Sequence, residues 1–246
     1  MMLKTTFGRC LYQSPSGLRV YQNACYRWLT FGNTILQTLI HRRHPERAGL
    51  KYILPLVELV RTFPGDCCLL GLGGGGIAHA ISPILSEYRL IAVEQNEEVM
   101  DIAARYFMTD TLSHLTSIHD NAATFVQSAT TAYQHILVDL HDANDFPLAC
   151  HTDAFFAGCK ARLRPTGILA VNLMQIQKNI TLFNRIRQQF EERTIVIPVT
   201  GTTNSLVIAL NEKKSTRFLR QLEEMSFLKS IIWNPDWGLV GQIKGA

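Results

Sequence analysis

A run of glycines is the strongest sign of chemistry in this sequence. Glycine occupies five of the six positions 71–76, directly after an apolar run. Glycine permits positive φ angles and lets the backbone approach a ligand closely. The spacing fits both GxGxxG and GxGxG, so it indicates a nucleotide or nucleoside site without choosing between ligands. A tight strand–helix turn without a ligand is the alternative. The glycines expected at such a site are Gly71, Gly73, Gly74 and Gly75.

Polar side chains close the next two predicted strands. Glu94 ends the second strand, where a carboxylate can accept hydrogen bonds from both ribose hydroxyls. Asp120 and Asn121 come directly after the third strand, where a polar side chain would lie beside the base. Either of these two residues could instead cap the next helix. Together with the glycine run, Glu94 predicts a bound nucleoside.

A second acidic group comes after the fourth predicted strand. Asp139 ends this strand, and Asp142 lies three positions further along the same loop. Ligands in open α/β sheets bind beyond the carboxyl ends of the strands, so Asp139 is expected beside the nucleoside. Two carboxylates this close raise each other's proton affinity, which suits binding or deprotonating an amine. His141 lies between them and could act as a base, or could be an incidental loop residue.

The elements that must position these residues alternate between strands and helices. The expected strands are 67–71, 89–94, 116–119, 135–139, 167–173, 194–199 and 206–211. The expected helices are 49–62, 76–87, 96–107, 121–130, 152–163, 178–192 and 214–226. Strand–helix alternation predicts right-handed crossovers and a mostly parallel sheet. The last two strands are separated only by a short polar turn, which predicts an antiparallel hairpin.

The first 48 residues have a different pattern. Short runs of β-forming residues are separated by turn signals such as Ser14-Pro15-Ser16-Gly17, which predicts an antiparallel meander of three or four strands. So small a unit should pack on the rest of the chain. We therefore expect a small N-terminal β domain (1–48) and an α/β domain (49–246). The α/β domain would be doubly wound around a mostly parallel seven-stranded sheet that ends in an antiparallel hairpin. The aromatic stretch 231–238 is expected to cover part of the sheet or a partner surface.

Composition excludes several classes of protein. Of 246 residues, 47% are hydrophobic and 18% charged, which rules out global disorder. The sequence has no apolar run long enough for a membrane span and no apolar signal at its start. The six cysteines form no CxxC pair and the eight histidines show no metal-ligand spacing, so we expect a cytoplasmic protein without metal. The net charge of the chain is +4. Its densest group of basic residues lies within positions 41–47, and we interpret this group as a solvated turn rather than a nucleic-acid site.

The order of these motifs resembles the spermidine-synthase-like proteins of the class I methyltransferase fold. The resemblance runs from about Gln37 to Leu210. It includes the glycine run, Val93-Glu94, the stretch 133–142, and 152–156 leading to 163–169. The family also has a small N-terminal β domain and an antiparallel last strand.

The resemblance implies a ligand of the S-adenosylmethionine type, with or without its carboxylate, and assigns roles to individual residues. Glu94 would hold the ribose and Asn121 would contact adenine, although the family has Asp there. Gln37 matches a glutamine that contacts the ligand, and Tyr52 a tyrosine of the amine site. Asp139 would accept a proton from the attacking amine. Asp142 would help to bind the diamine.

The sequence also departs from the family pattern. Aminopropyltransferases carry GGGDGG, and the position of that acid is Gly74 here. The family acid grips the amine tail of decarboxylated S-adenosylmethionine and repels the carboxylate of the intact compound. The residue before Tyr52 is Lys51 rather than an acid, which is unfavourable beside a diamine if it points inward.

These residues allow four functions. The first is aminopropyl transfer to an amine such as putrescine. Methyl transfer from intact S-adenosylmethionine to an unknown acceptor, and a cofactor-binding module without catalysis, are the main alternatives. An NAD-dependent oxidoreductase is disfavoured, because nothing resembles a second nucleotide-binding half. The expected partners are a small amine or other acceptor and a second copy of the chain, without nucleic acid or membrane.

Overall fold

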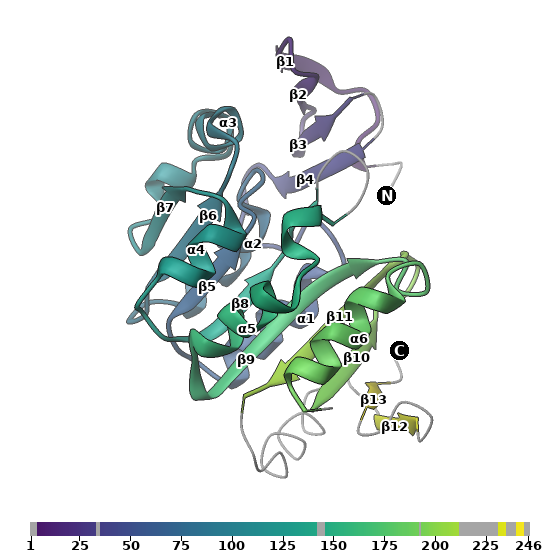
Figure 1. Cartoon of the computed structure of the whole chain (residues 1–246). Helices are drawn as coiled ribbons and strands as arrows, with labels where there is room; N and C mark the ends of the chain where they lie inside the picture. Colours follow the sequence, from purple (N-terminus) through teal and green to yellow (C-terminus); the bar gives the residue numbers. More distant parts are fainter. Residues whose placement is uncertain are drawn as a thin grey trace.

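The protein is built on two sheets that stand apart in space (Figure 1). The computed structural model describes residues 4–32, 35–141, 146–191, 193–211, 231–234 and 240–243. A four-stranded antiparallel sheet comes first in the chain, and a nine-stranded sheet flanked by helices comes after it. This arrangement confirms the predicted α/β fold with a separate N-terminal antiparallel sheet. The boundary at residues 48 and 49 stays a prediction.

The N-terminal sheet packs its apolar face on the larger unit. Its strands are β1 (Arg9–Gln13), β2 (Leu18–Gln22), β3 (Tyr26–Phe31) and β4 (Ile35–His41), each antiparallel to the next. Side chains from three of these strands form one buried cluster with the helix α3 (Glu97–Phe107). The cluster contains Leu18, Val20, Leu29 and Ile40 of the sheet and Val99, Ile102 and Phe107 of the helix. The prediction that this unit packs on the rest of the chain is confirmed.

The larger sheet has the strand order β12-β13-β10-β11-β9-β8-β5-β6-β7. Its strands are β5 (Cys67–Leu70), β6 (Leu90–Glu94), β7 (Leu115–His119), β8 (Tyr133–Val138), β9 (Leu163–Met174), β10 (Thr194–Pro198), β11 (Asn204–Leu210), β12 (Ile231–Asn234) and β13 (Val240–Ile243). The chain builds outward from β5 through β6 to β7, then returns to place β8 on the other side of β5. The carboxyl ends of β5 and β8 therefore flank the point where strand order reverses, which is where such folds bind ligands.

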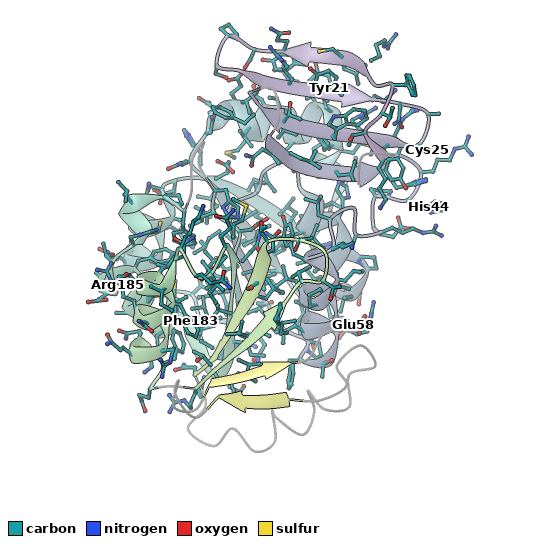
Figure 2. All side chains as sticks on the ribbon, turned by 90° about the vertical axis from the view of Figure 1, so that its right-hand side faces the viewer. Tyr21, Cys25, His44, Glu58, Phe183 and Arg185 are labelled. Carbon is teal, nitrogen blue, oxygen red and sulfur yellow. The ribbon has the colours of Figure 1, made fainter. Side chains whose placement is uncertain are left out.

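Helices cover both faces of this sheet. They are α1 (Ile53–Thr62), α2 (Gly76–Ile81), α3, α4 (Ala122–Ser128), α5 (Asp153–Ala161) and α6 (Ile180–Gln189). Phe183 and Arg185 on α6 lie on one side of the sheet and Glu58 on α1 lies on the other (Figure 2).

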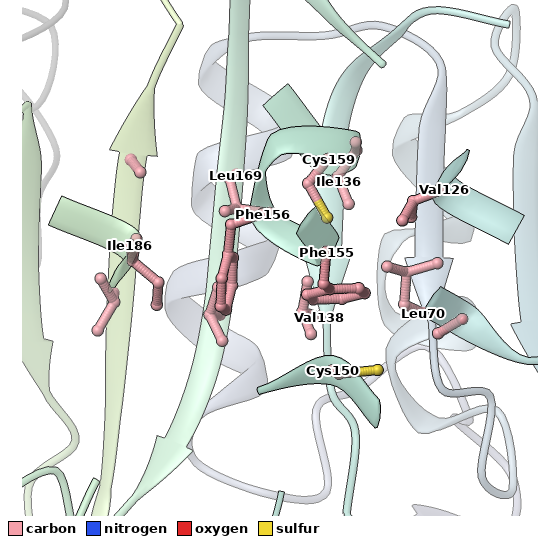
Figure 3. Packing of buried hydrophobic residues seen from close by; sticks show 14 of the residues in the cluster. Leu70, Val126, Ile136, Val138, Cys150, Phe155, Phe156, Cys159, Leu169 and Ile186 are labelled. Atoms are coloured by element: carbon pink, nitrogen blue, oxygen red, sulfur yellow. The ribbon is translucent and has the colours of Figure 1, made fainter. Parts of the chain in front are cut away.

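Alternation along the strands divides the core into two apolar layers. Cys67 and Leu69 of β5 pack with α1 and α2, whereas Cys68 and Leu70 pack with α4, α5 and α6. Figure 3 shows the second layer, where Phe155 and Phe156 of α5 lie over β8 and β9. All four cysteines of these layers are free thiols. Burial raises the pKa of Cys68 to about 12, so this thiol stays protonated and packs as an apolar group.

Two differences from the sequence-based expectation have physical reasons. The helix expected over 76–87 ends at Ile81, and Ser82–Ile84 forms a 3₁₀ turn, because Pro83 has no N–H to continue the α-helix. The sheet has nine strands because β13 pairs in parallel with β10 and β12 pairs antiparallel with β13, which covers an otherwise open edge. The helix expected over 214–226 lies outside the described residues. Within the described segments, no helix has the length and apolar character needed to cross a bilayer.

His135 in β8 makes the fold sensitive to acid. Its ring is fully buried and bonds through Nε2 to the carbonyl of Phe63. Burial lowers its pKa from 6.5 to about 4. Because the pKa of His135 is lower in the folded protein than in the unfolded chain, its neutral ring contributes fully to the free energy of unfolding above pH 6.5. This contribution, about 3 kcal/mol, is lost as pH falls toward 4.

We therefore expect His135→Gln to flatten the loss of unfolding free energy between pH 6.5 and pH 4, measured by urea denaturation. The matched control is His119→Gln, because His119 is exposed on β7. Equal pH slopes for the wild type and His135→Gln would contradict the assignment.

Candidate active site

A cavity of about 880 Å³ lies beyond the carboxyl ends of β5, β6 and β8, bounded by β4 and the glycine turn. Its size is typical of a site for a small organic ligand. The sequence-predicted residues that line it are Gln37, Tyr52, Gly71, Gly73, Glu94, Asp120, Asn121 and Asp139. The structure thus brings together residues that are widely separated along the chain. Asp142 lies outside the described residues.

The glycine turn depends on two positions without a side chain. Gly71 has φ +95°, and a Cβ there would lie 2.3 Å from the carbonyl oxygen of Asp139. Gly75 has φ +75° at the start of α2, and its Cβ would lie 2.3 Å from Cγ2 of Thr109. Neither space nor backbone conformation therefore accommodates another residue at these two positions. Gly74 and Gly75 of this turn are buried and do not line the cavity.

Glu94 is held in place by the turn that it faces. Its Oε2 accepts hydrogen bonds from the N–H groups of Leu72 (3.2 Å) and Gly73 (3.3 Å). Its Oε1 accepts from the N–H of Asn96 at 3.0 Å. A carboxylate oxygen has two lone-pair sites, so Oε1 retains one for a ligand hydroxyl. This geometry supports the predicted ribose contact, which stays a prediction.

Asn121 combines the two roles left open by the sequence. Its Oδ1 caps α4 by accepting from the N–H of Ala123 at 2.9 Å, while its Nδ2 donates to Oε1 of Gln95. Asp120 Oδ1 accepts from the N–H of Asn121 at 2.7 Å. Both residues also line the cavity. The helix cap therefore fixes Asn121 beside the cavity, and the adenine contact stays a prediction.

Asp139 is a carboxylate of the cavity whose two oxygens are both held by side-chain donors. Its Oδ2 accepts from the hydroxyl of Tyr52 at 2.7 Å, and its Oδ1 accepts from Nδ2 of Asn172 at 2.8 Å. Asn172 is oriented in turn by Asn204, whose Nδ2 donates to Oδ1 of Asn172 at 3.0 Å. Neutral groups from the start of α1, from β9 and from β11 thus fix an acidic group at the cavity wall.

Tyr52 acts in this network as a hydrogen-bond donor. Burial, and then the charge of Asp139, raise its pKa well above 10. The phenol therefore stays protonated throughout the physiological range. His141 Nε2 lies 3.9 Å from Asp139 Oδ1, and its Nδ1 is buried without a hydrogen-bond partner. A protonatable ring thus stands beside Asp139 in the cavity wall.

Gly74, which stands where the family that the sequence resembles carries an acid, contacts the side chain of Thr38. The N–H of Gly74 donates to Oγ1 of Thr38 at 2.8 Å, and a Cβ on Gly74 would meet Thr38 side-chain atoms at 3.0–3.1 Å. Thr38 of β4 therefore occupies the space into which a side chain at position 74 would project. Lys51 also lines the cavity, but its Nζ donates to the carbonyl of Thr200 at 3.2 Å.

Sequence reasoning missed Thr38, Asn172 and Asn204. Asn172 had a usable signal, since it is the one polar residue in the buried run 168–173. Thr38 and Asn204 carry no local signal, because their partners lie on other strands. The described residues contain no cluster of three or more metal-ligating side chains.

Comparison with known structures defines the class of fold. The chain is similar to a human methyltransferase-like protein 13 in complex with SAH, with TM-score 0.57 and 18% identity over 69% of this chain and 83% of that one. It is more similar to a probable spermidine synthase from Corynebacterium glutamicum, with TM-score 0.70 and 16% identity over 90% and 89%. A spermidine synthase in complex with the transition-state analogue AdoDATO gives TM-score 0.68 and 16% identity over 93% and 83%. The fold is therefore that of the class I methyltransferases.

Sequence comparison shows which proteins of this fold the chain resembles in sequence. The chain is 26% identical over 193 residues to a polyamine aminopropyltransferase of Chromobacterium violaceum, covering 77% of this chain and 74% of the relative. It is 25% identical over 203 residues to a polyamine aminopropyltransferase of Neisseria meningitidis, covering 80% and 77%. No protein-family model matches the chain. The chain is spermidine-synthase-like, as its motifs predicted.

The close approach at Gly71 gives a prediction. We expect Gly71→Ala to destabilise the fold and to weaken nucleoside binding about tenfold or more, because the added Cβ must displace the backbone of Asp139. Thermal unfolding and calorimetric binding of methylthioadenosine measure the two effects.

The control for this prediction is Gly32→Ala. Gly32 also has positive φ, +59°, but a Cβ there meets nothing within 4 Å. This variant should lose only the stability that backbone strain costs and should bind the nucleoside normally. Equal binding losses in both variants would contradict a role for the contact between Gly71 and Asp139.

Proposed function

We propose that the protein transfers an aminopropyl group from decarboxylated S-adenosylmethionine to a small amine, such as putrescine. The observation that carries this proposal is the Asp139 carboxylate, only 16% exposed, held at both oxygens by neutral donors at the cavity wall. The similarity to polyamine aminopropyltransferases supports it. We also propose a cytoplasmic location, which the buried free thiols support.

The reaction requires positioning and one proton acceptor. The neutral amine attacks the carbon next to the sulfonium, a C–N bond forms as the C–S bond breaks, and methylthioadenosine leaves as a neutral thioether. The amine then loses a proton, which the carboxylate of Asp139 accepts. Tyr52 and Asn172 keep that carboxylate oriented, and Glu94 and Asn121 would hold the nucleoside so that the reacting atoms are aligned.

The charges around the cavity favour a donor without a carboxylate. Its described lining carries three acids, Glu94, Asp120 and Asp139. The two lysines of the lining contact neutral groups, Lys51 the carbonyl of Thr200 and Lys4 the ring of Tyr26, and against three acids they leave the lining with a net negative charge. An anionic tail on the donor would therefore be repelled, whereas an ammonium would be attracted.

One observation favours methyl transfer as the second candidate function. Thr38 stands where an acid at position 74 would lie, so the family's means of rejecting the carboxylate of intact S-adenosylmethionine is missing here. The two functions make opposite demands on the donor, which makes them separable by binding alone.

We expect decarboxylated S-adenosylmethionine to bind at least about tenfold more tightly than the intact compound, measured by isothermal titration calorimetry. The double variant Thr38→Ser with Gly74→Asp introduces an acid and removes Cγ2, one of the three Thr38 atoms that its Cβ would meet, and should widen this preference. Tighter binding of the intact compound by the wild type would support methyl transfer instead. NAD should not bind.

The role of Asp139 gives a second test. We expect Asp139→Asn to lower turnover of decarboxylated donor and putrescine by about 10²-fold or more, with donor affinity unchanged, because proton acceptance is lost and the nucleoside contacts are kept. The control is Asp101→Asn, which removes an exposed carboxylate on α3. Unchanged turnover in Asp139→Asn would refute the proton-accepting role.

A further inference from the structure

A second cavity, of about 300 Å³, lies beside the N-terminal sheet. Its lining comes from the N-terminal sheet and from the residue that follows α3. Arg27 lies in β3 and Ile40 in β4, and the other sheet residues lie just before β3 or just after β4. The lining residues are Ala24, Arg27, Ile40, Arg42, Arg43 and Met108, and none of them lines the first cavity. Three of the six are arginines and none is acidic. Cys25 and His44, which adjoin this cavity in sequence, lie at the same end of the sheet in Figure 2.

Two of the three guanidinium groups are fixed by the fold. Arg27 donates from Nε to Oε1 of Gln22 at 2.9 Å and from Nη1 to the carbonyl of Tyr106. Arg42 donates from Nη1 to the carbonyls of Asn23 and Ala24, both at 3.1 Å. A guanidinium has five N–H donors, so each group keeps further donors for a ligand. Their orientation is therefore set before any ligand arrives.

The positive charge of this cavity is not balanced by the protein around it. Among the described residues, no carboxylate forms an ion pair with Arg27, Arg42 or Arg43; the neighbouring acid Glu46 pairs with His44. Residues 1–48 contain seven of the 24 Lys and Arg residues but only one of the 20 Asp and Glu residues. Burial, and to a smaller extent Arg42, lower the pKa of Arg27. An anion would relieve this repulsion between like charges.

We propose that this arginine pocket is a binding site for a small phosphorylated ligand. The planar guanidinium donates pairs of parallel hydrogen bonds that match phosphate oxygens. The bond from Arg27 to the carbonyl of Tyr106 covers the negative end of α3, which would otherwise oppose an anion. A volume of about 300 Å³ is at the lower end for ligand pockets and fits a phosphate or diphosphate group with a small organic part. Ile40 and Met108 supply an apolar wall for an organic part.

The test is calorimetric titration of the full chain with inorganic pyrophosphate at low salt. The double variant Arg42→Gln with Arg43→Gln should bind at least about tenfold more weakly than the wild type, because it loses two exposed donor groups. The control, Arg9→Gln with Arg47→Gln, removes the same charge from exposed positions outside the pocket and should bind normally. Circular dichroism establishes that all three proteins are folded.

Three results would overturn the proposal. They are no binding of pyrophosphate by the wild type at millimolar concentration, an equal loss in the control variant, and binding of a single-stranded oligonucleotide without binding of pyrophosphate. A titration with ADP then distinguishes an organic phosphate from the inorganic ion as the ligand. Tighter binding of ADP than of pyrophosphate supports an organic phosphate, and equal binding supports the inorganic ion.

Discussion

The contact between Gly71 and the carbonyl of Asp139 is the constraint on which the site depends. The two strands β5 and β8 leave the sheet side by side, and their ends stay close because position 71 has no side chain. The same closeness aligns the glycine turn with Glu94, through the N–H groups of Leu72 and Gly73. One backbone approach therefore positions the Glu94 side and the Asp139 side of the cavity together. A side chain at position 71 would separate them.

The network around Asp139 fixes a charged group without adding a second charge to its hydrogen bonds. Tyr52 and Asn172 are neutral donors, and each satisfies one carboxylate oxygen. Because burial and the charge of Asp139 raise the pKa of Tyr52, the phenol stays a donor rather than becoming a competing anion. An acid held by neutral donors keeps its negative charge available to accept a proton from an amine in the cavity. This is the property that transfer to an amine needs from the wall of the cavity.

The N-terminal sheet contributes to two different environments. Gln37 and Thr38 of β4 close the acidic cavity, and Thr38 fills the space behind the glycine turn. Ile40, two residues further along the same strand, lines the arginine pocket. The helix α3 connects the two places, since Val99 near its start lines the large cavity and Met108 after its end lines the arginine pocket. Acidic and basic sites are thus kept apart by one strand and one helix.

The sequence by itself determined the alternation of strands and helices, the two faces of the sheet and the acids at the ends of its strands. These features follow from the alternation of short apolar runs with amphipathic stretches along the sequence. Only the tertiary structure decided that Tyr52 meets Asp139, 87 positions away, and that Thr38 meets Gly74, 36 positions away. It also decided the covering of β10 by β13 and the gathering of Arg27 with Arg42 and Arg43. These contacts arise from the packing of whole elements, whose relative placement no local pattern of residues encodes.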